Sequence, residues 1–76
     1  MSGLPVVSGR QTVAALGKIG YVLVRQRGSH MRLRHPTDPT RRPTTVPDHS
    51  ELKTGTLRAI LRDSAVTVEQ FRELLG

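Results

Sequence analysis

Residues 21–35 read YVLVRQRGSHMRLRH, and this stretch holds two short runs of strand composition around one glycine. Residues 21–26 are rich in aromatic and β-branched side chains, and residues 29–35 alternate polar with apolar ones, as strands do. Gly28 lies between the two runs and can supply the turn. We therefore predict a β-hairpin with Arg27-Gly28 as its two-residue loop.

This hairpin register sorts the side chains onto two faces, because directly opposed residues share a sheet face. Arg25 is expected opposite His30, and Val24 opposite Met31. The apolar face, which we expect to meet the core, carries Val22, Val24, Met31 and Leu33. The open face carries Tyr21, Leu23, Arg25, His30, Arg32 and Arg34. A slip by one residue would bury the arginines, so both strands favour this register.

The segment before the hairpin predicts a helix over residues 8–20. Its apolar side chains recur at helical spacing and form one stripe. Ser8 is a suitable N-cap, and Gly20 is a suitable end. We expect this helix to pack its apolar stripe against the core.

The segments after the hairpin complete the predicted fold. Residues 41–47 hold a short third strand, and residues 55–64 and 67–75 predict two helices. The order is then α-β-β-β-α-α in a single domain over residues 1–76. Short loops between consecutive strands imply an antiparallel sheet. The fold class is α+β, with helices on one face of a three-stranded sheet and the other face open to solvent or a ligand.

Composition restricts the functions that the chain can have. It has 76 residues and no cysteine, which excludes disulfides, thiolate metal sites and a cysteine nucleophile. The N-terminal stretch MSGLPVVSGR does not have the pattern of a signal peptide. No apolar stretch approaches the length needed to cross a bilayer, so no membrane partner is predicted. We expect a cytoplasmic protein.

The charge points to nucleic acid. Lys and Arg number 12 against 6 acidic residues, which gives a net charge of +6. Ten of these basic residues are arginines, whose planar fork can bond two phosphate oxygens at once. The sequence pI of about 11.4 is in the range of nucleic-acid-binding domains. A solvated cationic surface and an acidic protein partner are the alternatives.

His30 is the candidate catalytic residue, because the register places it on the open face among arginines. Imidazole ionises near neutral pH, so it suits general acid–base catalysis. A base would take the proton of a ribose 2′-OH, and that oxygen would attack the adjacent phosphorus. Arginines would stabilise the charge on the phosphoryl oxygens. DNA lacks the 2′-OH, so this route selects RNA. The candidate RNA contacts are Arg25, Arg27, Ser29, Arg32, Arg34 and Lys53.

The remaining histidines have open or structural roles. His35 and His49 could by type supply the acid for the leaving 5′-oxygen, but His35 has core-facing parity at a strand end, which favours a structural role. The three histidines lack tight ligand spacing, so no metal site and no cofactor are predicted. Lys53 precedes a helix start, where free N–H groups can bind phosphate, although a simple cap is the plainer interpretation.

Several segments together resemble the HicA toxin family, from about Gly9 to Leu75. They are GYVLVRQRGSH (20–30), RHP (34–36), TVP with a nearby histidine (45–49), EL (51–52) and GTLRAILRDS (55–64). The resemblance implies a fold like the double-stranded RNA-binding domain and metal-independent cleavage of mRNA. It also implies that His30, in Gly-Ser-His, is the functional histidine. A HicB antitoxin encoded beside the toxin would cover the active face.

One position departs from the family pattern. Members often have Ala-Gly-Leu where Ser64-Ala65-Val66 stands here, so a glycine at the helix end is missing. This loss affects how the helix ends more than it affects chemistry. A short C-terminal helix such as residues 67–75 occurs in some members only.

Three other functions stay open at this point. A non-catalytic RNA-binding domain of the same fold would bind RNA in a salt-sensitive way without cleaving it. A helix-turn-helix over residues 55–75 would bind duplex DNA, although its apolar residues are needed for the core. A protein-interaction domain would use the basic face on an acidic partner and would bind no nucleic acid.

Overall fold

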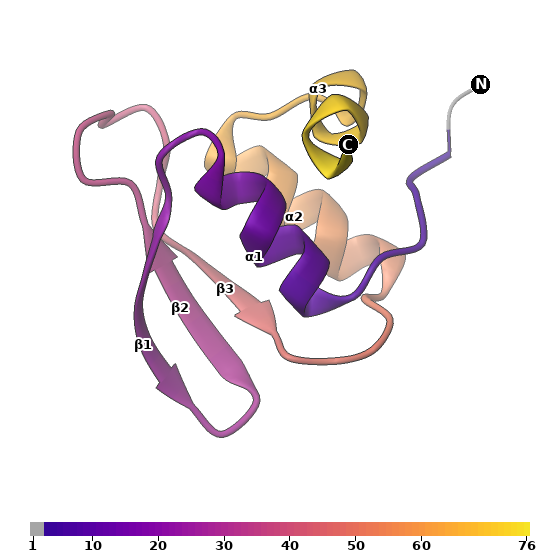
Figure 1. Ribbon diagram of the computed structural model, residues 1–76, viewed down its shortest axis with the longest axis horizontal. Helices are drawn as coiled ribbons and strands as arrows, with labels where there is room; N and C mark the ends of the chain where they lie inside the picture. The colour runs from indigo at the N-terminus through magenta and orange to yellow at the C-terminus, as the bar shows by residue number, and fades with distance from the viewer. Residues whose placement is uncertain (1–2) are drawn as a thin grey trace.

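A computed structural model of the chain describes residues 3–76 and contains the predicted α-β-β-β-α-α order (Figure 1). The elements are α1 (Gly9–Gly17), β1 (Val22–Arg27), β2 (His30–Arg34), β3 (Thr44–Pro47), α2 (Thr54–Ser64) and α3 (Val68–Leu75). The strands form one antiparallel sheet in the order β1-β2-β3. The predicted α+β class is confirmed. The first two residues of the N-terminal stretch, and of the predicted 1–76 domain, lie outside the described residues.

The helices cover only part of the sheet. Both α1 and α2 pack on β3, and α3 packs on α1. In Figure 1 the hairpin of β1 and β2 projects beyond the helices, with β1 at the free edge. The core therefore lies between the helices and the β2–β3 half of the sheet. Its fully buried apolar side chains include Leu16, Leu33, Val46, Leu57 and Phe71.

The hairpin turn lies one residue further along than predicted. Gly28 and Ser29 form the turn, so Arg27 stands opposite His30 instead of lying in the loop. Gly28 has φ +58°, and Ser29 does not have a positive φ. This is the φ pattern of a type II′ turn, which takes glycine at its first central position and matches the twist of a hairpin. Arg27-Gly28 would have placed the glycine second.

The predicted pairing of β1 with β2 was wrong as well. Arg25 lies opposite Arg32, and the register shifts between Leu23 and Arg25, which leaves Val24 as an extra, bulged residue. The bulge offsets the displaced turn, so Arg25 still shares a face with His30 and Arg32. The open face predicted for these three side chains is therefore correct, although their pairing differs.

Four apolar residues near β1 lie on other surfaces than predicted. Val22 is exposed because it pairs with Arg34 on the open face, and the bulged Val24 is exposed and lines a hollow with Arg25, Arg32 and Arg34. Leu23 pairs with Leu33 and so belongs to the helix side of the sheet. Tyr21 was predicted on the open face but is buried, and its hydroxyl donates to the carbonyl oxygen of Arg42 at 2.7 Å. Met31 and Leu33 are buried as predicted.

The helix ends agree with expectation only in part. Helix α1 begins after Ser8, whose side chain accepts a hydrogen bond from the Gln11 amide, but it ends at Gly17 instead of Gly20. Helix α2 ends at Ser64 as predicted, and its C-cap residue Ala65 has φ +57°, the left-handed conformation that glycine adopts most easily. None of the helices in residues 3–76 is long and apolar enough to cross a membrane.

Candidate functional site

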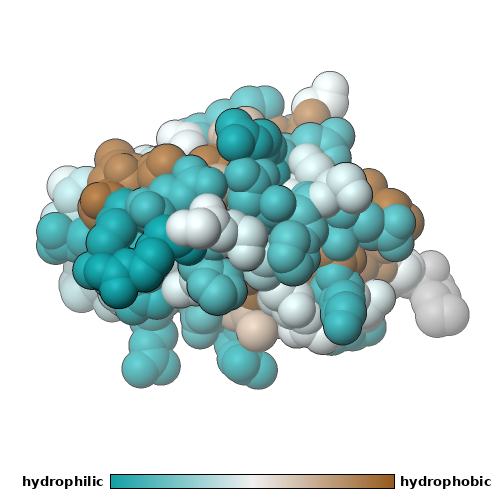
Figure 2. Space-filling view, turned by 90° about the horizontal axis from the view of Figure 1, so that it is seen from below, coloured by the Kyte–Doolittle hydropathy of each residue, from teal (hydrophilic) through white to brown (hydrophobic). Residues whose placement is uncertain are grey.

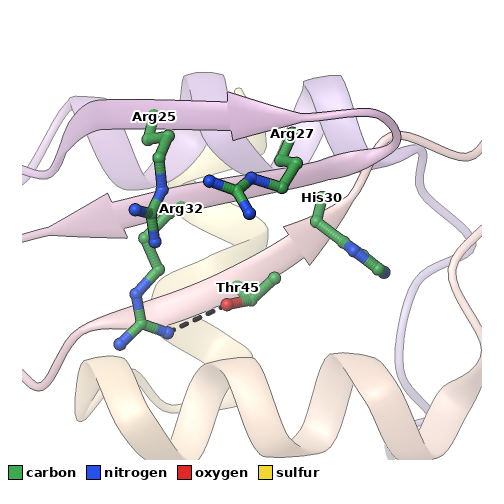
Figure 3. Close-up of a pocket in the computed structure, with 5 residues that line it drawn as sticks. All are labelled: Arg25, Arg27, His30, Arg32 and Thr45. Atoms are coloured by element: carbon green, nitrogen blue, oxygen red, sulfur yellow. Dashed lines mark hydrogen bonds between the residues drawn. The ribbon is translucent and has the colours of Figure 1, made fainter.

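A shallow hollow lies on the face of the sheet that the helices leave open (Figure 3). Its volume is about 280 Å³, and its lining consists of Arg25, Arg27, His30, Arg32 and Thr45. The sheet register explains this grouping, because Arg25 faces Arg32, Arg27 faces His30, and Arg32 faces Thr45. Side chains that face each other directly lie on the same side of a sheet. Three strands therefore deliver one histidine, three arginines and one threonine to a single surface.

The opposed arginines make this face electrostatically unfavourable by itself. Arg25 and Arg32 are direct cross-strand partners, and like charges in that position cost roughly 0.2–1 kcal/mol. No acidic side chain lines the hollow to offset them. A bound phosphate would relieve the repulsion and accept hydrogen bonds from the guanidinium groups. The arrangement is therefore suited to an anion.

Thr45 orients one of the arginines. The Arg32 Nη1 donates to Thr45 Oγ1 at 2.9 Å, and Figure 3 shows this bond across the sheet. Within residues 3–76, neither Arg25 nor Arg27 has a hydrogen bond or ion pair that occupies its guanidinium group. The hollow thus combines one oriented guanidinium with two that can adjust to a ligand.

His30 stands beside the arginines with a free ring. It is exposed at the start of β2, and in Figure 3 its imidazole extends away from the guanidinium groups, with Thr45 between it and Arg32. No hydrogen bond from another of residues 3–76 occupies either ring nitrogen. The imidazole is therefore free to exchange a proton with a bound molecule.

The turn that carries His30 is tied to the body of the protein through Asp48. The backbone amide of Asp48 donates to the Ser29 carbonyl oxygen at 2.6 Å. Its carboxylate accepts from Arg10 Nε at 3.0 Å, from Arg10 Nη2 at 2.9 Å and from Gln26 Nε2 at 3.3 Å. The Arg10 hydrogen bond is the main reason that the pKa of Asp48 lies below its ordinary value. Asp48 thus joins α1, β1 and the hairpin turn.

A close backbone contact reinforces this connection. The Gly9 amide donates to the His49 carbonyl oxygen at 2.9 Å, which places the start of α1 against the chain that follows β3. A Cβ atom at Gly9 would lie 1.9 Å from the Pro47 carbonyl oxygen. Only glycine allows this approach, so Gly9 keeps Asp48 close to Arg10.

The other predicted RNA contacts lie around the hollow. Arg34 lines a neighbouring hollow of about 380 Å³, together with Val24, Arg25, Arg32 and Pro43. Ser29 is in the turn, next to His30. Lys53 is the exposed N-cap residue of α2, where no side chain caps the helix, and it does not line either hollow. The structure therefore groups the arginines with His30 and places Lys53 apart from them.

The other two histidines are outside the hollow. His35 Nε2 donates to the Ile19 carbonyl oxygen at 2.7 Å, and its Nδ1 accepts from the Asp38 amide at 3.0 Å. Its ring also meets Tyr21 edge-on, with 5.3 Å between the ring centroids. These contacts agree with a structural role for His35. His49 is exposed in the loop after β3.

Sequence reasoning missed two residues of this region. Thr45 lies opposite Arg32, and the polar-apolar alternation of β3 could have assigned it to the open face. Asp48 contacts residues far away in the chain, so no local pattern marks it. Among residues 3–76 there is no group of three histidine, aspartate or glutamate side chains that could hold a metal ion.

Comparison with known proteins identifies a family that matches most of the chain. The family described as "HicA toxin of bacterial toxin-antitoxin" matches residues 9–66, which cover all three strands and the first two helices. His30 and the arginines of the hollow lie inside this range. None of the curated proteins compared with the chain matches it.

Proposed function

Since the chain belongs to the HicA toxin family, the toxins of bacterial toxin–antitoxin pairs, we propose that it is an endoribonuclease that cleaves mRNA at the hollow around His30. A cognate antitoxin partner follows from the family, and we propose that a HicB antitoxin inhibits the chain. The observation that carries the proposal is the position of His30. It is the only imidazole that lines the hollow, and three arginines share the surface.

In the proposed reaction the arginines hold the scissile phosphate against the sheet. Arg25 and Arg32 lie opposite each other and can reach two oxygens of one phosphate, while Arg27 lies across from His30. The neutral His30 imidazole takes the proton of the ribose 2′-OH, and the 2′-oxygen attacks phosphorus. The guanidinium groups stabilise the negative charge that develops on the phosphoryl oxygens. Water in the open hollow protonates the leaving 5′-oxygen, and the hydroxide that remains takes the proton back from the His30 imidazolium.

The Asp48 contacts support this mechanism by fixing the turn. A general base must lie within hydrogen-bonding reach of the proton that it removes. His30 follows directly after Ser29, whose carbonyl oxygen is held by the Asp48 amide. We therefore assign Asp48 as a positioning residue, which acts on His30 through the backbone and not on the RNA.

One observation favours a second candidate function. His30 is the one histidine among the residues that line the hollow, and neither His35 nor His49 joins it. A non-catalytic RNA-binding domain would need the arginines but no second acid. In that case His30 would be one more polar contact to RNA.

Cleavage of RNA by the purified chain in EDTA separates the two candidates. The wild type is expected to cut, and His30→Ala is expected to bind RNA but not cut it. His49→Ala is the matched control, because His49 is also an exposed histidine but does not line the hollow. Circular dichroism checks that all three proteins are folded. If none of them cuts and all bind RNA equally, the enzyme proposal fails.

A further inference from the structure

The free edge of β1 is the largest unexplained feature outside the hollow. The sheet order leaves β1 paired with β2 alone, so no strand formed by residues 3–76 lies on its other side. All six residues of β1 are exposed. An unpaired edge presents backbone N–H and C=O groups that can pair with an added strand.

The first half of this edge is apolar. Val22, Leu23 and Val24 are 45%, 47% and 49% exposed, and Val6 is the other exposed large apolar side chain among residues 3–76. Figure 2 shows a hydrophobic patch at the left, the side on which β1 lies in Figure 1. Leu23 is the cross-strand partner of Leu33. Leu33 is fully buried, whereas Leu23 is about half exposed. Natural edges are usually protected by charge, and this half of β1 is not.

We propose that β1 accepts a strand from an acidic partner, and that this strand alternates apolar with acidic side chains. The partner's identity as the antitoxin rests on the proposed function. On the helix side of the sheet, the apolar side chains of the added strand would cover Leu23. On the open side, its acidic side chains would meet Arg25 and Arg27, because an added strand has the same two faces as the sheet.

Charge argues for this occupant over a second copy of the chain. The chain has a net charge of +6, so two copies repel each other. Pairing of two β1 edges would also bring Arg25 and Arg27 of both copies onto adjoining strands, where like charges are unfavourable. The bulge at Val24 disturbs regular pairing and so further opposes unselective association. An acidic strand removes the repulsion.

Because β1 borders the hollow, a strand added to its edge would affect RNA binding at the hollow. Arg25 and Arg27 belong to β1 and also line the hollow beside His30. Acidic side chains paired with these arginines would occupy the donors that RNA phosphates need. Strand addition at the edge would therefore inhibit the hollow without any contact to His30.

Hydrogen exchange of the chain, alone and in complex with the HicB protein encoded beside it, tests the proposal. Amides of β1 are expected to exchange more slowly in the complex, with the change centred on residues 22–27. The matched variants are Leu23→Glu and Val6→Glu, each of which places an acid at an exposed apolar site. Leu23→Glu should weaken the complex about tenfold or more, and Val6→Glu should leave it unchanged.

The outcomes separate this inference from the ribonuclease proposal. Slower β1 exchange in the complex supports strand addition even if the chain does not cut RNA. Unchanged β1 exchange in an inhibited complex, or no binding of HicB, overturns strand addition even if the chain does cut RNA. A dimer of the chain alone that Leu23→Glu dissociates would show that a second copy occupies the edge, and would also overturn it. The exchange measurement uses the wild type, so it holds even if Leu23→Glu fails to fold.

Discussion

The two faces of β2 differ completely, although one strand of alternating residues makes both. Met31 and Leu33 are buried against the helices, whereas His30, Arg32 and Arg34 are exposed. The buried face is fixed by packing, so changes there affect folding. The open face carries charge and a free imidazole, so changes there should affect chemistry with little effect on stability. Alternate residues of β2 are thus expected to affect different properties: the buried ones stability, and the exposed ones activity.

The largest expected effect contrasts His30 with His35. His30→Ala should lower the RNA cleavage rate about 10²–10⁴-fold, the usual contribution of a general base, and leave thermal stability almost unchanged. His35→Ala leaves the Ile19 carbonyl oxygen without its partner, so it should cost roughly 1–3 kcal/mol of stability. Cleavage rates and thermal melts of both variants measure the two effects. Equal loss of activity in the two folded variants would contradict the assignment of a catalytic role to His30 and a structural role to His35.

The next effect contrasts the paired leucines. Leu33→Ala removes a fully buried side chain and should cost about 2–5 kcal/mol. Leu23→Ala changes a half-exposed side chain opposite it and should cost no more than about 1 kcal/mol. Urea unfolding of the free chain provides both values. Similar costs would mean that β1 is covered in solution by something other than the helices.

A smaller effect distinguishes the arginines by position. Arg32→Ala should weaken RNA binding and reduce the slope of log affinity against log salt by about 0.7, the value for one phosphate of a single strand. Arg58→Ala removes an exposed arginine from α2, outside both hollows, and should change the slope little. Titrations of RNA at several salt concentrations measure the slopes. Identical slopes in the two variants would mean that binding does not depend on the open face.

Much of this comparison could be predicted from the sequence, but only where local pattern decides the structure. The alternation in residues 30–34 predicts which side chains of β2 are buried, and it places His30 with the arginines. The sequence of β1 begins VLV, which has no polar alternation to fix a register. Its turn was therefore placed one residue too early and the bulge at Val24 was missed, so Val22 and Val24 were assigned to the core face although they lie with the arginines of the open face.

The rest depends on contacts between distant parts of the chain. The extent of the helix layer decides whether β1 is covered, and no pattern within β1 reports it. Asp48 meets Arg10 and Gln26 only in the folded chain. Tyr21 is buried, and its hydroxyl donates a hydrogen bond to the Arg42 carbonyl oxygen, 21 residues further along the chain. The roles of such residues cannot be predicted from the residues next to them in the sequence.

The smallest expected effect concerns the pH dependence of the turn. The folded-state pKa of Asp48 lies below its ordinary value of 3.8, mainly through the Arg10 hydrogen bond. Its ionised form therefore stabilises the fold above that pH, and this stabilisation is lost as the pH falls through the lower folded value. The melting temperature of the wild type should exceed that of Asp48→Asn near neutral pH, and the difference should close below about pH 4. A difference that grows on acidification would contradict this.

The most direct test of the central claim compares two forms of one RNA in EDTA. One form has ordinary ribose, and in the other every 2′-OH is methylated, so both offer the same phosphates to the arginines. The wild-type chain should cut the first form, leave 2′,3′-cyclic phosphate ends, and fail to cut the second, while His30→Ala should cut neither. Cleavage of the methylated RNA, or undiminished cleavage by folded His30→Ala, would contradict a histidine base acting on the 2′-OH.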